Sequence, residues 1–569
     1  MIVRREVPNP LPSLGEQLHP VLARAYAARG VNSENELEVG ASALATFDAL
    51  GGVDAATSIL ANAIERNERI LIVGDYDADG ATSTALMIRA LSAMGAKQVS
   101  YLVPNRFEDG YGLSPAIVDA ATSFAPQVLV TVDNGISSLD GVAYARERGI
   151  RVIVTDHHLP GAALPTADAI VNPNVPGDAF PSKNLAGVGV AFYLLAALRA
   201  HLSKAGWFER ASLNAPKMAQ WLDLVALGTV ADVVPLDHNN RILVHQGLAR
   251  IRARQCCPGI SALLGIGKRD ARNAVAADLG FAVGPRLNAA GRLNDMTVGI
   301  ECLLTDQPQA AASLAASLDD LNAERRQLEA YMTSQAEQAV ADLRLGADLP
   351  EALALFEPDW HAGVVGIVAS RVKDRVHRPV IAFAKDGDGS LKGSARSVEG
   401  VHIKDALELM AAKNPGLILK FGGHAMAAGM TIAESAFEAF AKEFARVVRD
   451  LVGPQGLKVH VFSDGGLDPA DRSMAVANLI RQAGPWGQGF AEPQFDDAFE
   501  VLEQRIVGGS HLKMILGCAA SGRRFDAIAF GLGEQHPCPS TIRAVYRLDI
   551  NQFRGATTLQ LLVQHIEPA

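Results

Sequence analysis

Three aspartates stand at alternate positions in the segment GDYDADG, residues 74–80. Asp75, Asp77 and Asp79 follow directly after an apolar run, and their carboxylates would repel one another without a nearby positive charge. Proteins that gather carboxylates at the end of a strand usually do so around a cation. A turn rich in Asp and Gly is the ordinary alternative, because such turns are common. These three residues are the first candidates for a metal site.

Three further segments place acidic or imidazole groups after apolar runs. They are TVDNG with Asp133, TDHH with Asp156, His157 and His158, and GTVADVVPL with Asp232. Each residue alone would more often serve as a cap or a turn residue. In an open parallel sheet, however, residues that follow neighbouring strands meet in one crevice at the carboxyl edge. The whole series therefore predicts a metal site rather than four separate turns.

The types of these side chains restrict the metal. Cysteine is absent from the set, which argues against structural zinc. Carboxylates suit Mg²⁺ or Mn²⁺, and imidazole favours Mn²⁺. Four or more carboxylates would leave excess negative charge around one divalent cation, so we expect two ions, the usual arrangement for in-line displacement at phosphorus. One carboxylate should bridge the two ions.

The elements that must position these residues follow an α/β pattern. Short apolar runs at 69–74, 127–132 and 151–155 alternate with helical segments such as 81–96. This alternation is typical of a parallel sheet covered by helices on both faces. We expect this domain to span residues 69–305, preceded by a helical segment, 1–68, that packs on it.

The rest of the chain predicts three more parts. Residues 306–345 combine strong helix formers with almost no helix breaker and predict one long connecting helix. Residues 346–455 predict a second α/β lobe. From 456 to 569, short alternating runs broken by glycine predict a small β-barrel of the OB-fold type. The expected fold class is thus α/β, with two lobes joined by a long helix and a C-terminal barrel.

Composition excludes several classes of protein. Lys and Arg total 52 against 62 for Asp and Glu, and the net charge of −10 argues against a histone-like polycation, although a local basic groove remains compatible with it. The five cysteines have no CxxC spacing, so a disulfide framework is not expected. The N-terminal segment has no apolar core like that of a signal peptide, and no apolar run reaches the ~18 residues of a membrane span. We therefore expect a cytoplasmic protein without a membrane partner.

Taken together, GDYDADG, TVDNG, TDHH and GTVADVVPL resemble the four motifs of the DHH phosphoesterase superfamily. FGGHAMAAGM, residues 421–430, resembles the glycine-rich signature of the associated second domain. Nearly the whole chain is similar to the bacterial single-strand-specific 5′→3′ exodeoxyribonucleases of that superfamily. The further segments that carry this resemblance are VPNRFEDGYGLS, GPRLNAAGRL, LKGSARS and WGQGFAEP. The resemblance implies hydrolysis of single-stranded DNA to 5′-mononucleotides in recombination and repair.

The resemblance also implies roles for individual residues. The expected metal ligands are Asp77, Asp79, Asp133, His157 and Asp232, with Asp133 as the bridge. Asp75 would be a supporting carboxylate. His158 would face the scissile phosphate and stabilise charge there, although a core histidine is the alternative. Asp156 would orient a histidine from behind the metal ligands.

Substrate contacts are implied in glycine-flanked segments, where arginine can hold a terminal phosphate through its two-pronged guanidinium. The candidates are Arg106, Tyr111, Arg286, Ser394, Arg396 and His424. For a single arginine, a solvated surface position is the commoner outcome. The segment around His424 is expected to be a glycine loop leading into a helix, whose backbone N–H groups would hold a phosphate. In the barrel, the expected DNA contacts are Phe490, His511, Lys513, Phe553 and Arg554.

The implied partners are single-stranded DNA, a single-strand-binding protein and a RecQ-type helicase, and the chain is expected to be a monomer. Two lobes joined by one helix would leave a narrow cleft that admits a single strand. Two alternatives remain open. One is a hydrolase of the same superfamily that acts on short oligonucleotides, cyclic dinucleotides or pyrophosphate. The other is a non-catalytic replication scaffold, although such proteins lose metal-binding carboxylates that are all present here.

Overall fold

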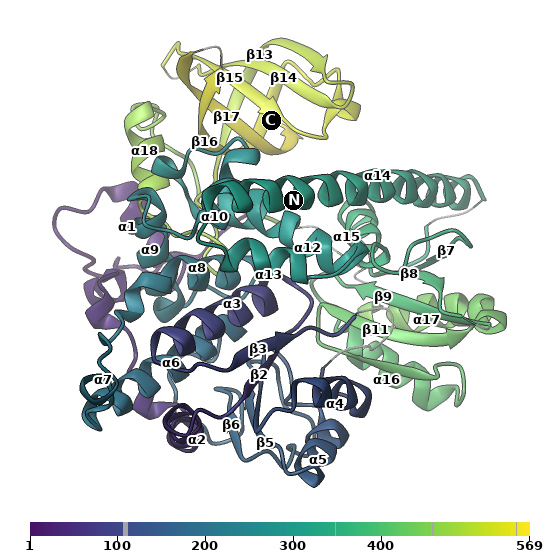
Figure 1. The fold of residues 1–569 in the computed structure, drawn as a ribbon. Helices are drawn as coiled ribbons and strands as arrows, with labels where there is room; N and C mark the ends of the chain where they lie inside the picture. The colour runs from purple at the N-terminus through teal and green to yellow at the C-terminus, as the bar shows by residue number, and fades with distance from the viewer. Residues whose placement is uncertain are drawn as a thin grey trace. The chain divides into compact units, whose positions relative to one another are not determined.

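The computed structural model describes residues 1–569 except 106–111, 347–348, 388, 454–455, 458–459, 520 and 554, and for 342–346 and 552–553 it describes the backbone alone. The chain forms two compact units (Figure 1). The first unit contains residues 1–319 and 460–569, and the second contains residues 320–459.

The first unit is built on a five-stranded sheet with the order β3-β2-β4-β5-β6, in which every pair is parallel. The strands are β2 (Ile70–Val73), β3 (Val99–Leu102), β4 (Val128–Val132), β5 (Arg151–Thr155) and β6 (Ala169–Val171). Every residue of β2 and β4 is buried, as expected for strands covered on both faces. The predicted parallel sheet is confirmed.

Helices cover the two faces of this sheet. On one face, Val118 and Val142 of α4 and α5 pack in a common core with Leu71, Leu129 and Val152 of the strands. Helices α3, α6 and α8 pack against one another elsewhere in the unit. The bounds of these elements are α3 (Ala78–Ala93), α4 (Pro115–Ala121), α5 (Leu139–Glu147), α6 (Gly187–Lys204) and α8 (Leu222–Ala231).

Further helices complete the unit and lead into the long helix. They are α2 (Val53–Glu65), α7 (Trp207–Arg210), α9 (His238–Arg252), α10 (Pro258–Ile266), α11 (Ala276–Asp278), α12 (Gly284–Leu293) and α13 (Thr297–Leu304). The predicted connecting helix is present as α14 (Pro308–Gly346), which runs without a break from the first unit into the second. Among the described residues, no single helix combines the length and apolar composition of a membrane span; by those measures alone, one bent pair, Ala41–Ala49 with Val53–Glu65, would qualify.

The N-terminal segment is not helical throughout, which corrects the sequence-based expectation. Before α1 (Pro20–Ala27), strand β1 (Ile2–Arg4) pairs in parallel with β12 (Val461–Ser463). A three-residue strand has too little periodicity to be seen in sequence, and its partner lies more than 450 positions away. The same junction carries a buried ion pair, with Arg29 Nη1 2.7 Å from Asp464 Oδ1.

The second unit has a five-stranded sheet with the order β10-β11-β9-β8-β7. Its elements are β7 (Leu353–Phe356), α15 (Val365–Val376), β8 (Val380–Lys385), β9 (Ser390–Arg396), α16 (Ile403–Lys413), β10 (Lys420–Gly423), β11 (Ala427–Ala433) and α17 (Phe437–Val452). The predicted α/β lobe is present. The glycine segment around His424 is a β-hairpin, however, and not a loop that begins a helix. Alternating side chains in AAGMTIA continue the strand, and the next helix begins only at Phe437.

The C-terminal barrel is confirmed as a closed sheet with the order β13-β14-β15-β17-β16. Its strands are β13 (Phe495–Val507), β14 (His511–Gly517), β15 (Arg524–Ala529), β16 (Thr541–Phe553) and β17 (Ala556–Pro568). The barrel begins at Phe495, later than the expected 456, because residues 460–494 form β12, α18 (Met474–Gln482) and the loop after it. Phe490 in this loop stacks on Trp486 in the interior and is not a DNA contact.

Candidate metal centre

The acidic and imidazole residues predicted from sequence converge at one edge of the parallel sheet. Asp75 and Asp77 follow β2, Asp133 follows β4, and His157 and His158 follow β5. Strands β2, β4 and β5 are neighbours in the sheet, so their carboxyl ends lie side by side. Asp232 joins them from the C-terminal end of α8.

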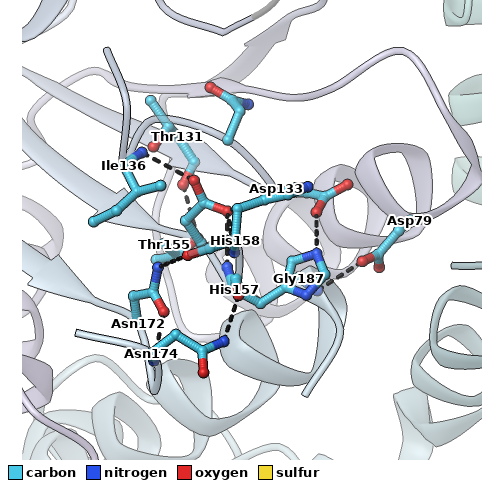
Figure 2. A network of polar contacts seen from close by, with 12 residues as sticks. Asp79, Thr131, Asp133, Ile136, Thr155, His157, His158, Asn172, Asn174 and Gly187 are labelled. Atoms are coloured by element: carbon cyan, nitrogen blue, oxygen red, sulfur yellow. Dashed lines mark hydrogen bonds and ion pairs between the residues drawn. The ribbon is translucent and has the colours of Figure 1, made fainter. Parts of the chain in front are cut away.

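Three overlapping groups of side chains are close enough to hold cations. Within each group, potential ligand atoms lie within 4.8 Å of one another. The groups are Asp75, Asp77 and Asp133; Asp79, His157 and Asp232; and Asp133, His157 and His158. His157 Nε2 lies 3.1 Å from Asp133 Oδ1 and 3.4 Å from Asp232 Oδ2. Asp133 and His157 each belong to two groups, so these two residues link the three groups; Figure 2 marks the contact between them.

Backbone N–H groups hold the carboxylates of Asp77 and Asp79 in place at the start of α3. Asp77 is the N-cap of that helix, and its Oδ1 accepts hydrogen bonds from the N–H groups of Asp79 and Gly80 at 2.9 and 3.0 Å. The carboxylate of Asp79 accepts the N–H groups of Gly187 and Val188, at 2.6 and 3.0 Å, where α6 begins (Figure 2). Two helix N-termini therefore orient these carboxylates and favour their charged form.

The close approach of these elements requires glycine and an unusual backbone. A Cβ on Gly187 would lie 2.6 Å from Asp133 Cβ, and one on Gly228 would lie 2.7 Å from Asp79 Oδ1. Asp133 itself has φ +61°, a left-handed conformation that aspartate tolerates better than most residues. Next to it, the Asn134 amide donates to the carbonyls of Val73 and Val132, which ties together the ends of β2 and β4.

A second layer fixes the two histidines. Asp156 Oδ1 lies 2.7 Å from His158 Nδ1, and its Oδ2 accepts the N–H of Ile136 at 2.9 Å (Figure 2). Because a carboxylate can only accept, the proton of this contact belongs to His158 Nδ1. Asn174 and Asn172 donate their side-chain amides to the carbonyls of His157 and His158, at 2.6 and 2.9 Å.

The electrostatics of the cluster show a shortage of positive charge. Burial, reinforced by neighbouring aspartates, raises the pKa of Asp79 to about 7 and the pKa values of Asp133 and Asp232 well above the usual range. Burial, together with His158, lowers the pKa of His157 to about 4, so this imidazole is neutral at pH 7, the form that ligates metals. Carboxylates that resist ionisation when close together become favourable once cations lie among them.

His158 and Asp156 form a pair with the opposite tendency. Burial alone would lower the pKa of His158, but the contact with Asp156 outweighs it and raises that pKa. Burial would raise the pKa of Asp156, but its hydrogen bonds with His158 and with backbone N–H groups lower it overall. The pair therefore favours a charged imidazolium beside an ionised carboxylate.

The donor set fits divalent cations. It consists of buried carboxylates and a neutral imidazole, the ligands that Mn²⁺ and Mg²⁺ sites use. Asp232 Oδ2 and His157 Nε2 are both buried and make no hydrogen bond within the described chain. Buried polar atoms without such partners are costly, and a bound cation would satisfy both.

Unlike the residues of the metal cluster, the predicted substrate contacts do not lie in one place. Arg286 donates from Nε to Asp319 Oδ1 at 2.8 Å and from Nη1 to the Ala282 carbonyl, so it anchors α12 to the start of α14. Arg106 and Tyr111 lie outside the described residues. The remaining three, Ser394, Arg396 and His424, belong to the second unit.

Within the second unit, Arg396 Nη1 donates to Ser394 Oγ at 3.0 Å, and His424 lies in the β10–β11 turn. A Cβ on Gly366 of α15 would lie 2.8 Å from Ser394 Oγ and 2.9 Å from Arg396 Nη2, so glycine makes room for this pair. Burial lowers the pKa of Arg396.

Sequence reasoning missed two residues that support the metal loop. Asn288 Oδ1 accepts the N–H of Ala78, between Asp77 and Asp79, at 2.8 Å. A Cβ on Gly291 would lie 1.8 Å from the Tyr76 carbonyl oxygen, so α12 packs directly on the loop. Both residues lie in the segment GPRLNAAGR, but in that segment only the arginines carry a charge that indicates a ligand contact.

Comparisons with known proteins cover the whole chain. Residues 69–229 match the DHH family N-terminal domain, residues 349–450 match the DHHA1 domain, and residues 463–565 match the RecJ OB domain. These ranges agree with the parallel-sheet domain, the second lobe and the barrel with its preceding segment.

Two relatives are similar along almost their full length. The chain is 53% identical over 567 residues to the single-stranded-DNA-specific exonuclease RecJ of Dickeya dadantii, covering 99% of this chain and 97% of the relative. It is also 53% identical to RecJ of Escherichia coli, covering 99% and 98%. The crystal structure of Thermus thermophilus RecJ in complex with Mn²⁺ superposes with a TM-score of 0.80 at 31% identity, covering 98% of this chain and 78% of that one.

Proposed function

This chain belongs to the RecJ family of single-stranded-DNA-specific exonucleases, and on that premise we propose that it degrades single strands from the 5′ end to 5′-mononucleotides at the cluster around Asp133 and His157. It is a metal-dependent hydrolase of phosphodiester bonds. The convergence of three ligand groups on the β2–β4–β5 edge carries the proposal, because phosphodiester hydrolysis with paired cations needs such a set of carboxylates.

We assign the metal ligands to Asp77, Asp79, Asp133, His157 and Asp232, with Asp75 as a supporting carboxylate. Asp133 is the proposed bridge between two ions, because it shares one group with Asp75 and Asp77 and another with His157. Bound Mn²⁺ or Mg²⁺ would generate hydroxide from water near neutral pH and neutralise the phosphate oxygens. RecJ of Thermus thermophilus has been crystallised with each of these ions.

His158 is the proposed stabiliser of charge at the scissile phosphate. Asp156 accepts the proton on Nδ1 and fixes the ring, so a second proton on Nε2 makes the ring a cation. The raised pKa of His158 favours that form. A fixed positive charge beside the phosphate stabilises negative charge that develops during displacement.

Arg396 and Ser394 are the proposed pocket for the terminal 5′-phosphate. Arg396 is largely buried and forms no ion pair with any carboxylate of the described chain, whereas the buried side chains of Arg29 and Arg472 do. A phosphate would supply the missing negative charge through a two-pronged contact. Arg106, Tyr111 and His424 are proposed as further contacts with the strand.

We also propose that the OB barrel tracks the single strand by sequence-independent contacts. Lys513 forms an ion pair with Asp526 at 2.6 Å, so His511 is the better candidate of the two described positions. We place the enzyme in the cytoplasm as a monomer that acts in recombination and repair. A single-strand-binding protein and a RecQ-type helicase would supply its substrate.

Incubation of the protein with 3′-labelled oligonucleotides tests the function. With Mn²⁺ or Mg²⁺, we expect 5′-mononucleotides from single strands, shortening from the 5′ end, and little product from blunt duplex. EDTA should abolish the reaction. Equal digestion of blunt duplex, or activity that survives EDTA, would contradict the proposal. Release of mononucleotides from the 3′ end would contradict the direction alone.

A further inference from the structure

A pocket of about 410 Å³ opens in the first unit beside the metal cluster but outside it. Its wall includes Val233, which directly follows the proposed ligand Asp232, and Arg252 of α9. Phe281 of the π-helical turn Leu279–Val283 and Arg481 of α18 complete the rim, and Trp486 forms part of the wall. Trp486, Tyr26 and Phe490 form a cluster in which each ring stacks on the other two, with centroids 5.2 to 5.9 Å apart, so this wall is well packed.

Two guanidinium groups in the pocket donate hydrogen bonds to backbone carbonyls and not to a carboxylate. Arg252 Nε donates to the Ala274 carbonyl at 2.9 Å, and Arg481 Nη2 donates to the adjacent Asn273 carbonyl at 3.1 Å. No carboxylate of the described chain lies within ion-pair distance of either group. By contrast, Arg547 in the same pocket is paired with Glu492 at 2.7 Å. The Glu492 carboxylate also attracts Arg481 at longer range, so the pocket lining sets three arginines against one carboxylate, and this excess of positive charge favours an anion such as a phosphate.

The rim of the pocket offers an aromatic ring to solvent. Phe281 is 78% exposed, and Val233 on the same rim is 63% exposed with φ +62°. A β-branched residue rarely adopts that backbone conformation, so local packing must hold the exposed valine there. An exposed aromatic ring beside arginines is the combination on which proteins stack the bases of single strands.

We propose that this pocket binds one nucleotide of the substrate strand, with the base on Phe281 and its phosphate between Arg252 and Arg481. This assignment rests on the proposed function, and it adds a subsite that extends the strand's path beyond the metal cluster. Asp232 faces His157 while the next residue lines the pocket, so the two sites share one short segment of backbone. A strand held at the cations would reach the pocket within a short distance.

The arginines are tested by equilibrium binding of a 3′-fluorescent, 5′-phosphorylated oligothymidine to the full-length protein in EDTA. Arg252→Gln and Arg481→Gln should each weaken binding about fivefold near 0.1 M salt and reduce the salt slope by about 0.7. Arg272→Gln is the matched control, because Arg272 is 66% exposed, pairs with Asp270 nearby and does not line the pocket. If both pocket variants bind the oligonucleotide with the same affinity as the Arg272 variant, the proposal is overturned.

The base contact is tested with oligonucleotides that carry a single abasic site at successive positions. One position should weaken wild-type binding by several-fold, and that penalty should disappear in Phe281→Ala but persist in Phe124→Ala, a partly exposed phenylalanine elsewhere in the unit. An abasic penalty that is the same in wild type and Phe281→Ala would overturn the base assignment.

Degradation by the wild-type protein and binding by the pocket variants, taken together, separate this inference from the function on which it rests. If wild-type protein fails to degrade single strands with Mn²⁺, the proposed function is wrong. If it degrades them while all pocket variants bind like wild type, only the nucleotide subsite is wrong. A short acidic peptide with an apolar C-terminus is the competing occupant. Its binding to the pocket without competition from oligothymidine would also overturn the nucleotide assignment.

Discussion

The edge of the β2–β4–β5 sheet and the pocket around Arg252 and Arg481 have opposite deficits of charge. The sheet edge gathers aspartates whose pKa values are raised by burial and by one another. The pocket lining sets three arginines against one carboxylate, Glu492, which pairs with Arg547. Each region would be unfavourable in isolation, and each becomes favourable when a ligand supplies the missing charge. The two together match a substrate that must meet cations at one phosphate and arginines at another.

The largest effect is expected when a negative charge is removed from the sheet edge. Asp133→Asn preserves the left-handed backbone, because asparagine tolerates that conformation, but it removes the proposed bridging carboxylate. We expect kcat to fall by more than about 100-fold, which is beyond the usual loss for a residue that only supports a ligand. Circular dichroism should show an intact fold. Asp270→Asn, which changes a carboxylate on the surface, is the control. If Asp133→Asn keeps activity within tenfold of wild type, Asp133 is not a metal ligand.

A smaller effect is expected when the metal loop loses its support from α12. Asn288→Ala deletes the acceptor of the Ala78 N–H, so the loop between Asp77 and Asp79 should lose its fixed geometry. We predict a drop of about 30-fold in kcat and a weaker apparent affinity for Mn²⁺. Asn288→Asp keeps an acceptor and should recover most of both quantities. Unchanged Mn²⁺ affinity in Asn288→Ala would show that the contact has no positioning role.

A further arginine without an ion pair in the described chain, Arg396, lies in the second unit and extends the comparison to the proposed pocket for the terminal phosphate. Arg396→Gln should raise KM for 5′-phosphorylated strands about tenfold and change kcat much less, because a charge-assisted contact is lost on binding. Strands with a 5′-hydroxyl should show a much smaller change. If KM rises equally for both kinds of end, Arg396 does not contact the terminal phosphate.

The smallest expected effect concerns stability and pH. Asp79, Asp133 and Asp232 have pKa values above those of an unfolded chain, so the folded metal-free protein binds more protons and loses stability as pH rises. Loss of the proton from His158, whose pKa is also raised, acts in the same direction. The neutral His157 contributes an opposite trend only below about pH 6.5, the ordinary histidine pKa.

Thermal unfolding in EDTA should therefore give a Tm that falls by at least about 3 °C between pH 6.5 and 8.5. Mn²⁺ should raise Tm more at the higher pH, since protons compete with the cation at the lower one. A Tm in EDTA that rises across this range would contradict the charge deficit assigned to the sheet edge.

The metal cluster could be predicted from sequence because its members follow apolar strands, and a parallel sheet brings strand ends together whatever the details of packing. Asp232 was also identifiable, since it ends an apolar stretch, although that stretch is a helix. Arg286 resisted prediction because its partner Asp319 lies on another helix, and only the folded packing of α12 on α14 brings the two together. The β10–β11 hairpin was missed because paired glycines precede both turns and helices.

The pairing of β1 with β12 joins the N-terminal strand to the segment that follows the second unit. During synthesis, Ile2–Arg4 has no neighbouring strand until residues 461–463 leave the ribosome, and Arg29 has no counter-ion until Asp464 does. The second unit, whose cores use residues 328–457 alone, can finish folding earlier. The second unit can therefore finish folding before the first, although the first begins earlier in the sequence, and the complete first unit forms only after residues 460–569 are synthesised.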